Sequence, residues 1–393
     1  MIIAQKKTGV GKTRLNSQVP LKDSKAQVPS LEVHLDYLRV KVELHSSDDS
    51  ELISFLKFIH PNQSEWIISH DVPYRNGRDW YDNRVQSSIG VSGGYKELQD
   101  DNGSIIGYEC VLDLGGLYFA NYNLVDQWRL ITGLSNVYSA RCQRIDIAID
   151  DNTNGKIIPI GEMWEATKTG TKGNTALFQK TRYYESGGCG ANNIPLRTWY
   201  FGSRNSGKMV RVYEKELHGC NGEKRRVMRF ESELKRKYSQ KVFDTVASLE
   251  RPYINGNTGD KIDNNSFSIE LSKVLGGIAL GTIDFVNRYD LSGKYIKEYA
   301  RCKRLHFWQE FIDKIGSFLR IRLPKVARTT EKSIAWITRQ VAGLLNAIKE
   351  GVGSAKLWEY LMDAMDERCK YKGSYHDLVT GTLREHPELL RVS

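Results

Sequence analysis

The stretch RIDIAID, residues 144 to 150, alternates between two kinds of side chain with a period of two. In a β-strand, residues two apart point to the same face. Asp146 and Asp150 therefore share one face of this strand, and three isoleucines share the other. The pattern predicts a strand with one buried face and two carboxylates on the other, although Asp150 followed by Asp151 is also typical of the start of a turn.

Similar alternation recurs on both sides of this stretch. At residues 31–44 the apolar positions change parity after Tyr37, which predicts one strand with a bulge. Four further period-two runs lie at residues 107–114, 197–202, 209–215 and 227–235. Glycine-rich polar connections are expected at 90–104 and 167–175, and a helix at 123–132. These runs predict an α+β domain built on an antiparallel sheet.

Beyond about residue 263 the apolar period becomes helical. One stripe runs from Trp308 to Leu319 and is expected to end at Pro324, and a second runs from Ile334 to Ile348. The first thirty residues are basic and lack apolar periodicity, which is typical of a mobile segment. The sequence therefore predicts a flexible tail over 1–30, an α+β domain over 31–262 and a helical region over 263–393.

The charge of the chain is unevenly distributed. Among 393 residues, 57 Lys and Arg exceed 47 Asp and Glu, for a net charge of +10. Residues 203–241 alone hold twelve Lys or Arg and five Glu. Such a run is typical either of a solvated basic face or of a track for nucleic-acid phosphates.

Several classes of protein are excluded by what the sequence lacks. No apolar stretch is long enough for a membrane span, and six scattered cysteines without a Cys-x-x-Cys pair predict reduced thiols and a cytoplasmic location. The GVGKT stretch near the start has Lys6 where a complete phosphate-binding loop needs Gly, so an ATPase is not expected.

Strand parity groups further reactive side chains. Arg229 and Glu231 share a face of one run, and Arg211, Tyr213 and Lys215 share a face of another. Clustered carboxylates without Cys or His partners suit Mg²⁺ or Mn²⁺. Such a cation and the arginines can activate a tyrosine to attack phosphorus. If the strands adjoin, they hold the parts for transesterification of a phosphodiester, although each part alone also fits a surface ion pair or a half-buried strand residue.

The succession RIDIAID, TWYFGSRNSGKMVRVYEK and RFESELK, at residues 144–150, 198–215 and 229–235, resembles the replication initiation factor family. This family includes initiators of rolling-circle plasmids and filamentous phages, and relaxases of some integrative conjugative elements. The resemblance implies an antiparallel nicking domain related to the HUH nucleases but without their paired histidines. None of the eight histidines here forms a His-x-His pair, which agrees.

The resemblance also implies an activity and its residues. A rolling-circle initiator, or alternatively a relaxase with the same chemistry, nicks one DNA strand to leave a 5′-phosphotyrosine and a free 3′-OH. The expected nucleophile is Tyr213, and Tyr200 is the alternative. The other roles are metal ligation by Asp146, Glu231 and Asp150, phosphate binding by Arg204, Lys208 and Arg211, and charge stabilisation by Arg211, Lys215 and Arg229.

Expected partners are origin DNA with a single-stranded or hairpin nick site, a second copy of the chain in a homodimer, and a host helicase and DNA polymerase. Specificity for the origin sequence is expected in the region after residue 263, which can also serve dimerisation, or in the loop at 170–181.

Two other functions remain open. Asp146 with Glu233 and Lys235 imitates the D…E-x-K pattern of nucleases that activate water, and a non-catalytic DNA-binding regulator would bind without cleaving.

Overall fold

The computed structural model describes residues 30–60, 66–76, 79–153, 155–168, 175–176, 181–186, 196–218, 224–250, 264–290, 292–298 and 301–323. By its contacts the chain divides into two compact units, Met1–Leu323 and Pro324–Ser393, and all described residues belong to the first. Residues 1–29 of the predicted tail over 1–30, and the helical stripe over 334–348, lie outside the described residues.

The described part of the chain contains both strands and helices. The strands are β1 (Leu31–Leu44), β2 (Trp66–Ser69), β3 (Tyr74–Asn76), β4 (Asp79–Tyr81), β5 (Asn83–Ser87), β6 (Val91–Gln99), β7 (Ile105–Leu114), β8 (Arg141–Asp151), β9 (Thr175–Ala176), β10 (Thr181–Ser186), β11 (Leu196–Gly202), β12 (Lys208–His218), β13 (Lys224–Lys235) and β14 (Asp284–Phe285). The helices are α1 (Ser50–Ile59), α2 (Gly116–Phe119), α3 (Leu124–Asn136), α4 (Ile160–Lys168), α5 (Lys237–Ala247), α6 (Asn264–Leu280) and α7 (His306–Ile315).

One large antiparallel sheet organises the fold. Its described strands run in the order β10-β11-β12-β13-β8-β1-β7-β6-β5-β2. The long strand β1 lies near the centre and pairs with β8 on one side and β7 on the other. Two short antiparallel pairs stand outside this sheet: the hairpin β3–β4, and β9–β14, whose strands are far apart in sequence. The structure thus confirms the predicted α+β class with an antiparallel sheet.

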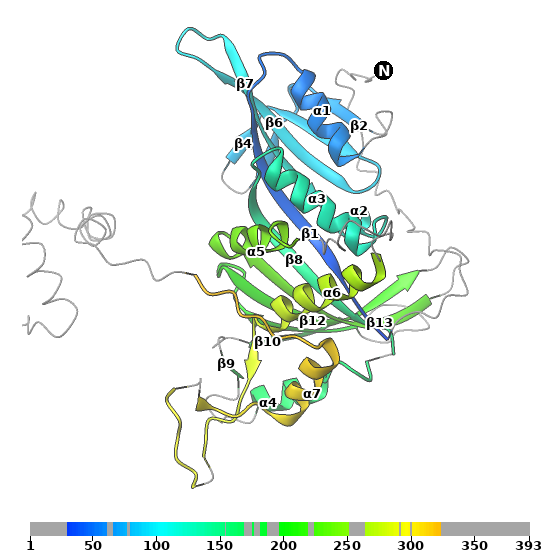
Figure 1. Ribbon diagram of the computed structural model, residues 1–393, viewed down its shortest axis with the longest axis vertical. Helices are drawn as coiled ribbons and strands as arrows, with labels where there is room; N and C mark the ends of the chain where they lie inside the picture. The colour runs from blue at the N-terminus through cyan, green and yellow to red at the C-terminus, as the bar shows by residue number, and fades with distance from the viewer. Residues whose placement is uncertain are drawn as a thin grey trace, which may run out of the picture. The chain divides into compact units, whose positions relative to one another are not determined.

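Helices cover one face of the sheet (Figure 1). This face carries the apolar positions predicted by alternation, among them Ile145, Ile147 and Ile149, which are fully buried. Helices α3, α5 and α6 contact the strands there, and α7 places Trp308 and Phe311 against Phe230 of β13. None of the described helices is both long and apolar enough to span a bilayer.

The predicted bulge in the first strand is confirmed. The register of β1 against β8 shifts between Leu35 and Tyr37, and again between Arg39 and Val40. Leu35 and Leu38 are both buried on the helix side. The residue inserted between Leu35 and Tyr37, Asp36, extends to the opposite face and contacts Arg229. The change of parity therefore places two consecutive side chains, Asp36 and Tyr37, on the face that lacks helices.

Two predictions about elements are wrong. Residues 90–104, expected to be a connection, contain the nine-residue strand β6. Glycines depress strand propensity, but here Gly93 and Gly94 are required because neighbouring atoms leave no space for a Cβ. The helix that starts the stripe at Trp308 ends at Ile315, not at Pro324. Gly316 closes it in the left-handed conformation, with φ of 77°.

The domain boundary also falls elsewhere than the composition indicated. The predicted division after residue 262 separates α6 and α7 from the sheet, whereas both helices pack on it. Ser232 of β13 donates a hydrogen bond from its hydroxyl to the carbonyl of Ala279 in α6 at 2.8 Å. The contacts therefore keep residues 264–323 with the sheet.

Candidate active site

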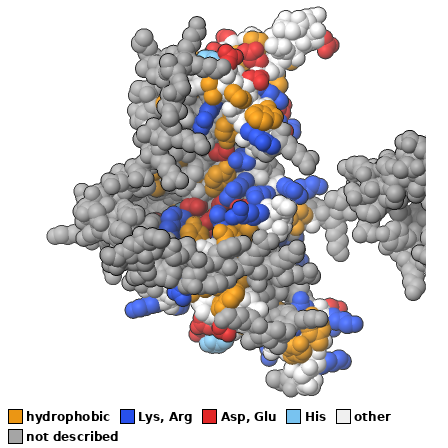
Figure 2. Space-filling view, turned by 180° about the vertical axis from the view of Figure 1, so that it is seen from behind, with side chains coloured by type: hydrophobic (Ala, Val, Ile, Leu, Met, Phe, Trp, Pro, Cys, Tyr) orange, Lys and Arg blue, Asp and Glu red, His pale blue; other side chains and the backbone are white. Residues whose placement is uncertain are grey.

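The predicted site residues lie on the sheet face opposite the helices, which we call the charged face. Strands β12, β13, β8 and β1 are neighbours there. Seen from behind, Lys and Arg side chains gather around Asp and Glu near the middle of this face (Figure 2). The register sets these pairs opposite one another: Arg211 and Glu231, Tyr213 and Arg229, Arg229 and Asp150, Glu233 and Asp146.

Three buried carboxylates, Asp146, Glu231 and Glu233, form an acidic cluster on this face. Arg211 NH2 contacts Glu231 Oε1 and lies 3.5 Å from Asp146 Oδ2. Arg144 donates from Nε to Asp146 Oδ1 at 2.9 Å, and its NH2 lies 2.8 Å from Glu233 Oε2. Two guanidinium groups therefore hold three acids together, as buried charges require.

The protonation of Asp146 is sensitive to added positive charge. Burial raises the pKa of this carboxyl well above its ordinary value, and the negative charges of Glu231 and Glu233 act in the same direction. The hydrogen bond and charge of Arg144 oppose them without cancelling them. A cation brought to the cluster would stabilise the ionised form of Asp146.

Tyr213 points its hydroxyl into this cluster. It donates a hydrogen bond from Oη to Glu231 Oε2 at 2.9 Å. Burial raises the pKa of Tyr213 above its ordinary value, and the charge of Glu231 raises it further, while Arg229 acts in the opposite direction. The phenol is therefore protonated at neutral pH and has a carboxylate acceptor already in contact with its proton.

A second cluster on the charged face is centred on Arg229, whose side chain is 3% exposed. Arg229 donates to Asp150 from Nε and from NH2, both at 2.6 Å, and it also contacts Asp36. His34 Nε2 lies 3.2 Å from Arg229 NH2, and Lys215 Nζ lies 4.0 Å from Asp36 Oδ1. Burial acts to raise the pKa of Asp150, but the hydrogen bonds and charge of Arg229 outweigh it and leave the pKa lowered.

The predicted role of Asp150 as a third metal ligand does not fit this geometry. Asp150 lies four positions after Asp146 along one strand, which corresponds to about 13 Å. Both of its carboxylate oxygens also accept hydrogen bonds from Arg229. In this structure Asp150 is therefore the partner of Arg229, and its role as a metal ligand stays a prediction.

The remaining predicted residues lie at the edges of the acidic cluster. Tyr200 of β11 is opposite Arg211 in register. Lys208 stands at the start of β12 with its Nζ 4.3 Å from the centre of the Tyr238 ring. Arg204 is exposed in the turn between β11 and β12, where its carbonyl accepts a hydrogen bond from Lys235 at 3.3 Å. The structure thus brings Tyr200 beside the cluster and leaves Arg204 outside it.

Sequence reasoning missed several members of the charged face. Arg144 opens the RIDIAID stretch and His34 and Asp36 come from β1, yet none was assigned a role. His34 carries a signal in its sequence, because it alternates with the buried Val33 and Leu35. Asp36 carries the same signal, because it lies two residues after His34 and follows the buried Leu35.

The donor set at the acidic cluster allows a hard cation with few protein ligands. No group of three His, Cys, Asp or Glu placed to hold a metal occurs in the portion of the chain that the structure describes. However, Asp146 and Glu231 both contact the same Arg211 nitrogen, so their oxygens converge. Mg²⁺ commonly takes one or two carboxylates and fills its remaining positions with water and phosphate oxygens. The two acids therefore fit such an ion.

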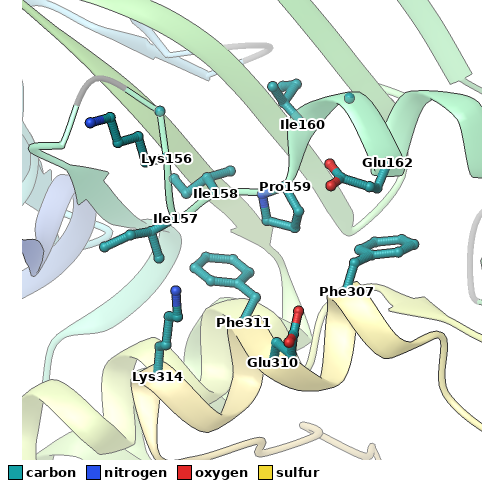
Figure 3. Close-up of a pocket in the computed structure, with 12 residues that line it drawn as sticks. Lys156, Ile157, Ile158, Pro159, Ile160, Glu162, Phe307, Glu310, Phe311 and Lys314 are labelled. Atoms are coloured by element: carbon teal, nitrogen blue, oxygen red, sulfur yellow. The ribbon is translucent and has the colours of Figure 1, made fainter.

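A cavity of about 220 Å³ lies elsewhere, between the segment 155–162 and α7 (Figure 3). Phe307 and Phe311 of α7 point toward Pro159 and Ile158 across it. Glu310 and Lys314 also contribute to its lining, whereas the members of the acidic cluster do not. The cavity is therefore separate from the charged face.

Known proteins resemble this chain in family and in fold. No match was found among curated proteins. A solved structure, described as that of a rolling circle replication initiator protein from Geobacillus stearothermophilus, matches with a TM-score of 0.50 and 20% sequence identity. The match covers 74% of this chain and 98% of that one, and it supports the fold described above.

A family model described as replication initiation factor matches residues 140–363, more than half of the chain. This range includes all three sequence motifs, and the chain belongs to the replication initiation factor family.

Proposed function

We propose that this chain initiates rolling-circle replication by nicking one strand of its origin DNA through a tyrosine. The observation that carries the proposal is the hydrogen bond from Tyr213 Oη to Glu231, at the edge of a cluster that also contains Arg211 and Asp146. The nucleophile Tyr213 thus contacts its proton acceptor, Glu231, and Glu231 contacts Arg211, whose positive charge can bind a phosphate.

In the proposed step, Tyr213 Oη attacks phosphorus while its proton passes to Glu231. The bond from phosphorus to the 3′-oxygen breaks, and that oxygen takes up a proton. The products are a 5′-phosphotyrosine and a free 3′-OH, so no oxidant or additional reactant is needed. Because the pKa of the buried phenol is raised, proton transfer to a carboxylate already in contact is an essential part of the step.

A divalent cation, Mg²⁺ or Mn²⁺, belongs to this proposal, and Asp146 and Glu231 would hold it. When bound, it would polarise a phosphoryl oxygen. Arg211, now bridging the two acids, is free to turn its guanidinium toward a DNA phosphate once another positive charge stabilises them.

The other basic residues divide into two roles. Arg229 is engaged by Asp150 and Asp36 and is nearly inaccessible, so we assign it to positioning the strands rather than to contact with DNA. Burial, and then the charge of Arg229, lowers the pKa of Lys215, whose side chain is 34% exposed. An added phosphate would favour its charged form, which suits Lys215 and the exposed Arg204 to the DNA backbone.

Assignment of the nucleophile is tested by trapping covalent protein–DNA adducts on a single-stranded origin oligonucleotide. Tyr213→Phe should abolish the adduct, because phenylalanine has no attacking oxygen, whereas Tyr200→Phe should retain it. Denaturing gels with Mg²⁺ present measure both variants against the unaltered chain. An adduct that persists in Tyr213→Phe shows that the assignment of Tyr213 is wrong. Loss of the adduct in Tyr200→Phe alone identifies Tyr200 as the nucleophile.

A water-activating nuclease is the second candidate, and one observation favours it. Glu233 lies opposite Asp146 in register, and Lys235 Nζ lies 2.5 Å from Glu233 Oε1, so the three residues of the D…E-x-K pattern lie together. This mechanism predicts cleavage with no covalent adduct in the same gels.

A non-catalytic regulator predicts DNA binding that is unchanged by Mg²⁺, and no cleavage. Relaxase activity in a conjugative element would use the proposed chemistry, and a homodimer, a host helicase and DNA polymerase remain expected partners.

A further inference from the structure

The hairpin β3–β4 forms a second layer on the charged face. Gly94 of β6 lies beneath it, and a Cβ at this glycine would come within 2.7 Å of Tyr74 Cβ and 2.8 Å of Tyr81 Cβ. Tyr81 is fully buried by this contact. Residues of the hairpin alternate, so Arg75 and Trp80, which follow and precede these tyrosines, point away from the sheet. The outer side of the hairpin therefore faces the same direction as the candidate active site.

Hydrogen bonds fix the hairpin to the strands that carry the site. The Tyr74 hydroxyl donates to Asp113 of β7. Arg39 of β1 donates from NH1 to Asn76 Oδ1 at 2.7 Å, and Asn76 Nδ2 donates to Gln143 Oε1 of β8 at 2.8 Å. Asn76 is itself buried. One short hairpin is thus held by three strands of the sheet, which makes it a rigid support.

The same network continues to the acidic cluster. Arg39 NH2 donates to Asp113 Oδ2 at 2.9 Å, and Asp113 also accepts from the Tyr37 hydroxyl. Arg144 stacks on the Tyr37 ring, with its guanidinium carbon 4.3 Å from the ring centre. Arg144 in turn binds Asp146. A continuous set of contacts therefore joins the hairpin to the proposed metal ligand.

The outer side of the hairpin presents an arginine and a tryptophan. Arg75 and Trp80 are paired in register, and the Arg75 guanidinium carbon lies 5.3 Å from the centre of the Trp80 ring. Trp80 is 57% exposed, more than the other exposed aromatic side chains of the described ranges, Phe58 and Tyr295. An exposed indole beside a guanidinium, held by a rigid support, is the arrangement on which unpaired nucleic-acid bases stack.

We propose that Trp80, with Arg75 beside it, binds an unpaired base of the DNA strand that passes the acidic cluster. This inference rests on the proposed function, because it assumes that single-stranded DNA lies on the charged face. Strand β7, which anchors the hairpin through Asp113, is four strand spacings from β12, or about 19 Å. By register Asp113 is level with Arg144, whereas Tyr213 is level with Asp150, six residues further along β8, which adds about 20 Å along the strands. The resulting diagonal of about 28 Å corresponds to about eight nucleotides at the rise of about 3.4 Å per nucleotide in duplex DNA. The stacked base therefore lies within about eight nucleotides of the bond that Tyr213 attacks.

The test compares two single-stranded probes that share a backbone: a 20-nucleotide oligothymidylate, and the same strand with every base removed. Their affinities for the full-length chain are measured by fluorescence anisotropy at one fixed salt concentration. The unaltered chain should bind oligothymidylate about 5- to 150-fold more tightly, the range expected for one stacked base. Trp80→Ala should bring this ratio close to one without changing the affinity for the abasic strand, and Trp80→Phe should keep part of the ratio.

Tyr295→Ala is the matched control. Tyr295 is also an exposed aromatic residue with an arginine nearby, since the Arg288 guanidinium carbon lies 5.9 Å from its ring centre. It belongs to the segment between β14 and α7, which is not part of the hairpin network, so the probe ratio should be preserved. An unchanged ratio in Trp80→Ala, an equal loss of affinity for both probes, or the same loss in Tyr295→Ala would overturn the proposal.

The outcome is separable from that of the proposed function. These binding measurements require neither an origin sequence nor cleavage. If Trp80→Ala removes the base-dependent affinity while the unaltered chain forms no covalent adduct on origin DNA, the nicking proposal fails and the assignment of Trp80 stands. If the adduct forms and the ratio is unaffected by Trp80→Ala, the assignment of Trp80 fails alone.

Discussion

Arg229 illustrates how a buried charge determines its surroundings. The guanidinium is held by two carboxylates from different strands, Asp150 of β8 and Asp36 of β1. Removing one partner from such a group leaves a buried charge without a counter-charge. The resulting loss in the free energy of unfolding exceeds what the original ion pair contributed. The Arg229 cluster is therefore expected to stabilise the position of β13 between β12 and β8, and thus the position of Glu231 two residues further along β13.

We expect Asp150→Asn to lower the free energy of unfolding by about 3 kcal/mol at pH 7, because Arg229 loses a charged partner. The pKa of Asp150 is lowered in the folded chain. As the pH falls, Asp150 is therefore protonated at a higher pH in the unfolded chain than in the folded chain. The stabilisation is present above the unfolded pKa of about 3.9 and is lost as the pH falls through the folded value. The difference between variant and unaltered chain should therefore shrink below about pH 4, as measured by urea unfolding.

The exposed pair of Glu298 and Arg301 provides the control for this measurement. Their side chains approach to 3.0 Å but remain largely in solvent. Glu298→Gln should change the free energy of unfolding by less than about 1 kcal/mol at either pH. A loss in Asp150→Asn as small as this one, or a loss that persists unchanged at pH 3, would contradict the role given to Asp150.

At the scale of residues, the sequence reveals faces but not partners. Alternation is a local property, so it correctly placed Asp146, Glu231, Arg211 and Tyr213 on one face. The bidentate contact that occupies Asp150 depends on strand neighbours, and the Asp36 contact joins residues 193 positions apart. No local pattern contains that information, which is why Asp150 was expected to bind a metal. The catalytic roles of the residues remain predictions.

Among the elements, β6 shows how packing can override propensity. Its two glycines would disfavour a strand in isolation. In the sheet, a Cβ at Gly93 would come within 2.1 Å of the Val111 carbonyl oxygen, and one at Gly94 would collide with the β3–β4 hairpin. The glycines therefore permit close approach of neighbouring backbone and of a second layer. Propensity alone predicted a connection because these neighbours are distant in sequence or belong to a hairpin too short to recognise.

We expect Gly94→Ala to displace the β3–β4 hairpin, at a cost of about 1 to 3 kcal/mol for overpacking. Hydrogen exchange should then accelerate at residues 74–81, and the binding preference for oligothymidylate over the abasic strand should fall as it does in Trp80→Ala. Gly161→Ala is the matched control, since no atom lies within 4 Å of its Cβ position in α4. If exchange in the hairpin is equal in the two variants, Gly94 does not support the hairpin.

For the described molecule as a whole, the sheet is completed by helices that follow it in sequence. Apolar periodicity correctly indicated helices after residue 263, but periodicity does not show what a helix packs against. Trp308 and Phe311 of α7 are buried against Phe230, and Leu275 and Ile278 of α6 are buried in the same core. The apolar face of the sheet therefore depends on residues that the composition assigned to a separate region.

Two shortened chains distinguish these boundaries. A chain ending at Leu323 should unfold cooperatively, with a Tm within a few degrees of the full chain, because it keeps every described contact of α6 and α7. A chain ending at residue 262 loses many large buried side chains, and Trp308, Phe311, Leu275 and Ile278 among them are worth about 2 kcal/mol each. That loss is comparable with the whole stability of a typical domain, so this chain should lack a cooperative transition in calorimetry and circular dichroism. A folded chain of 262 residues with an unchanged Tm would instead support the division drawn from composition.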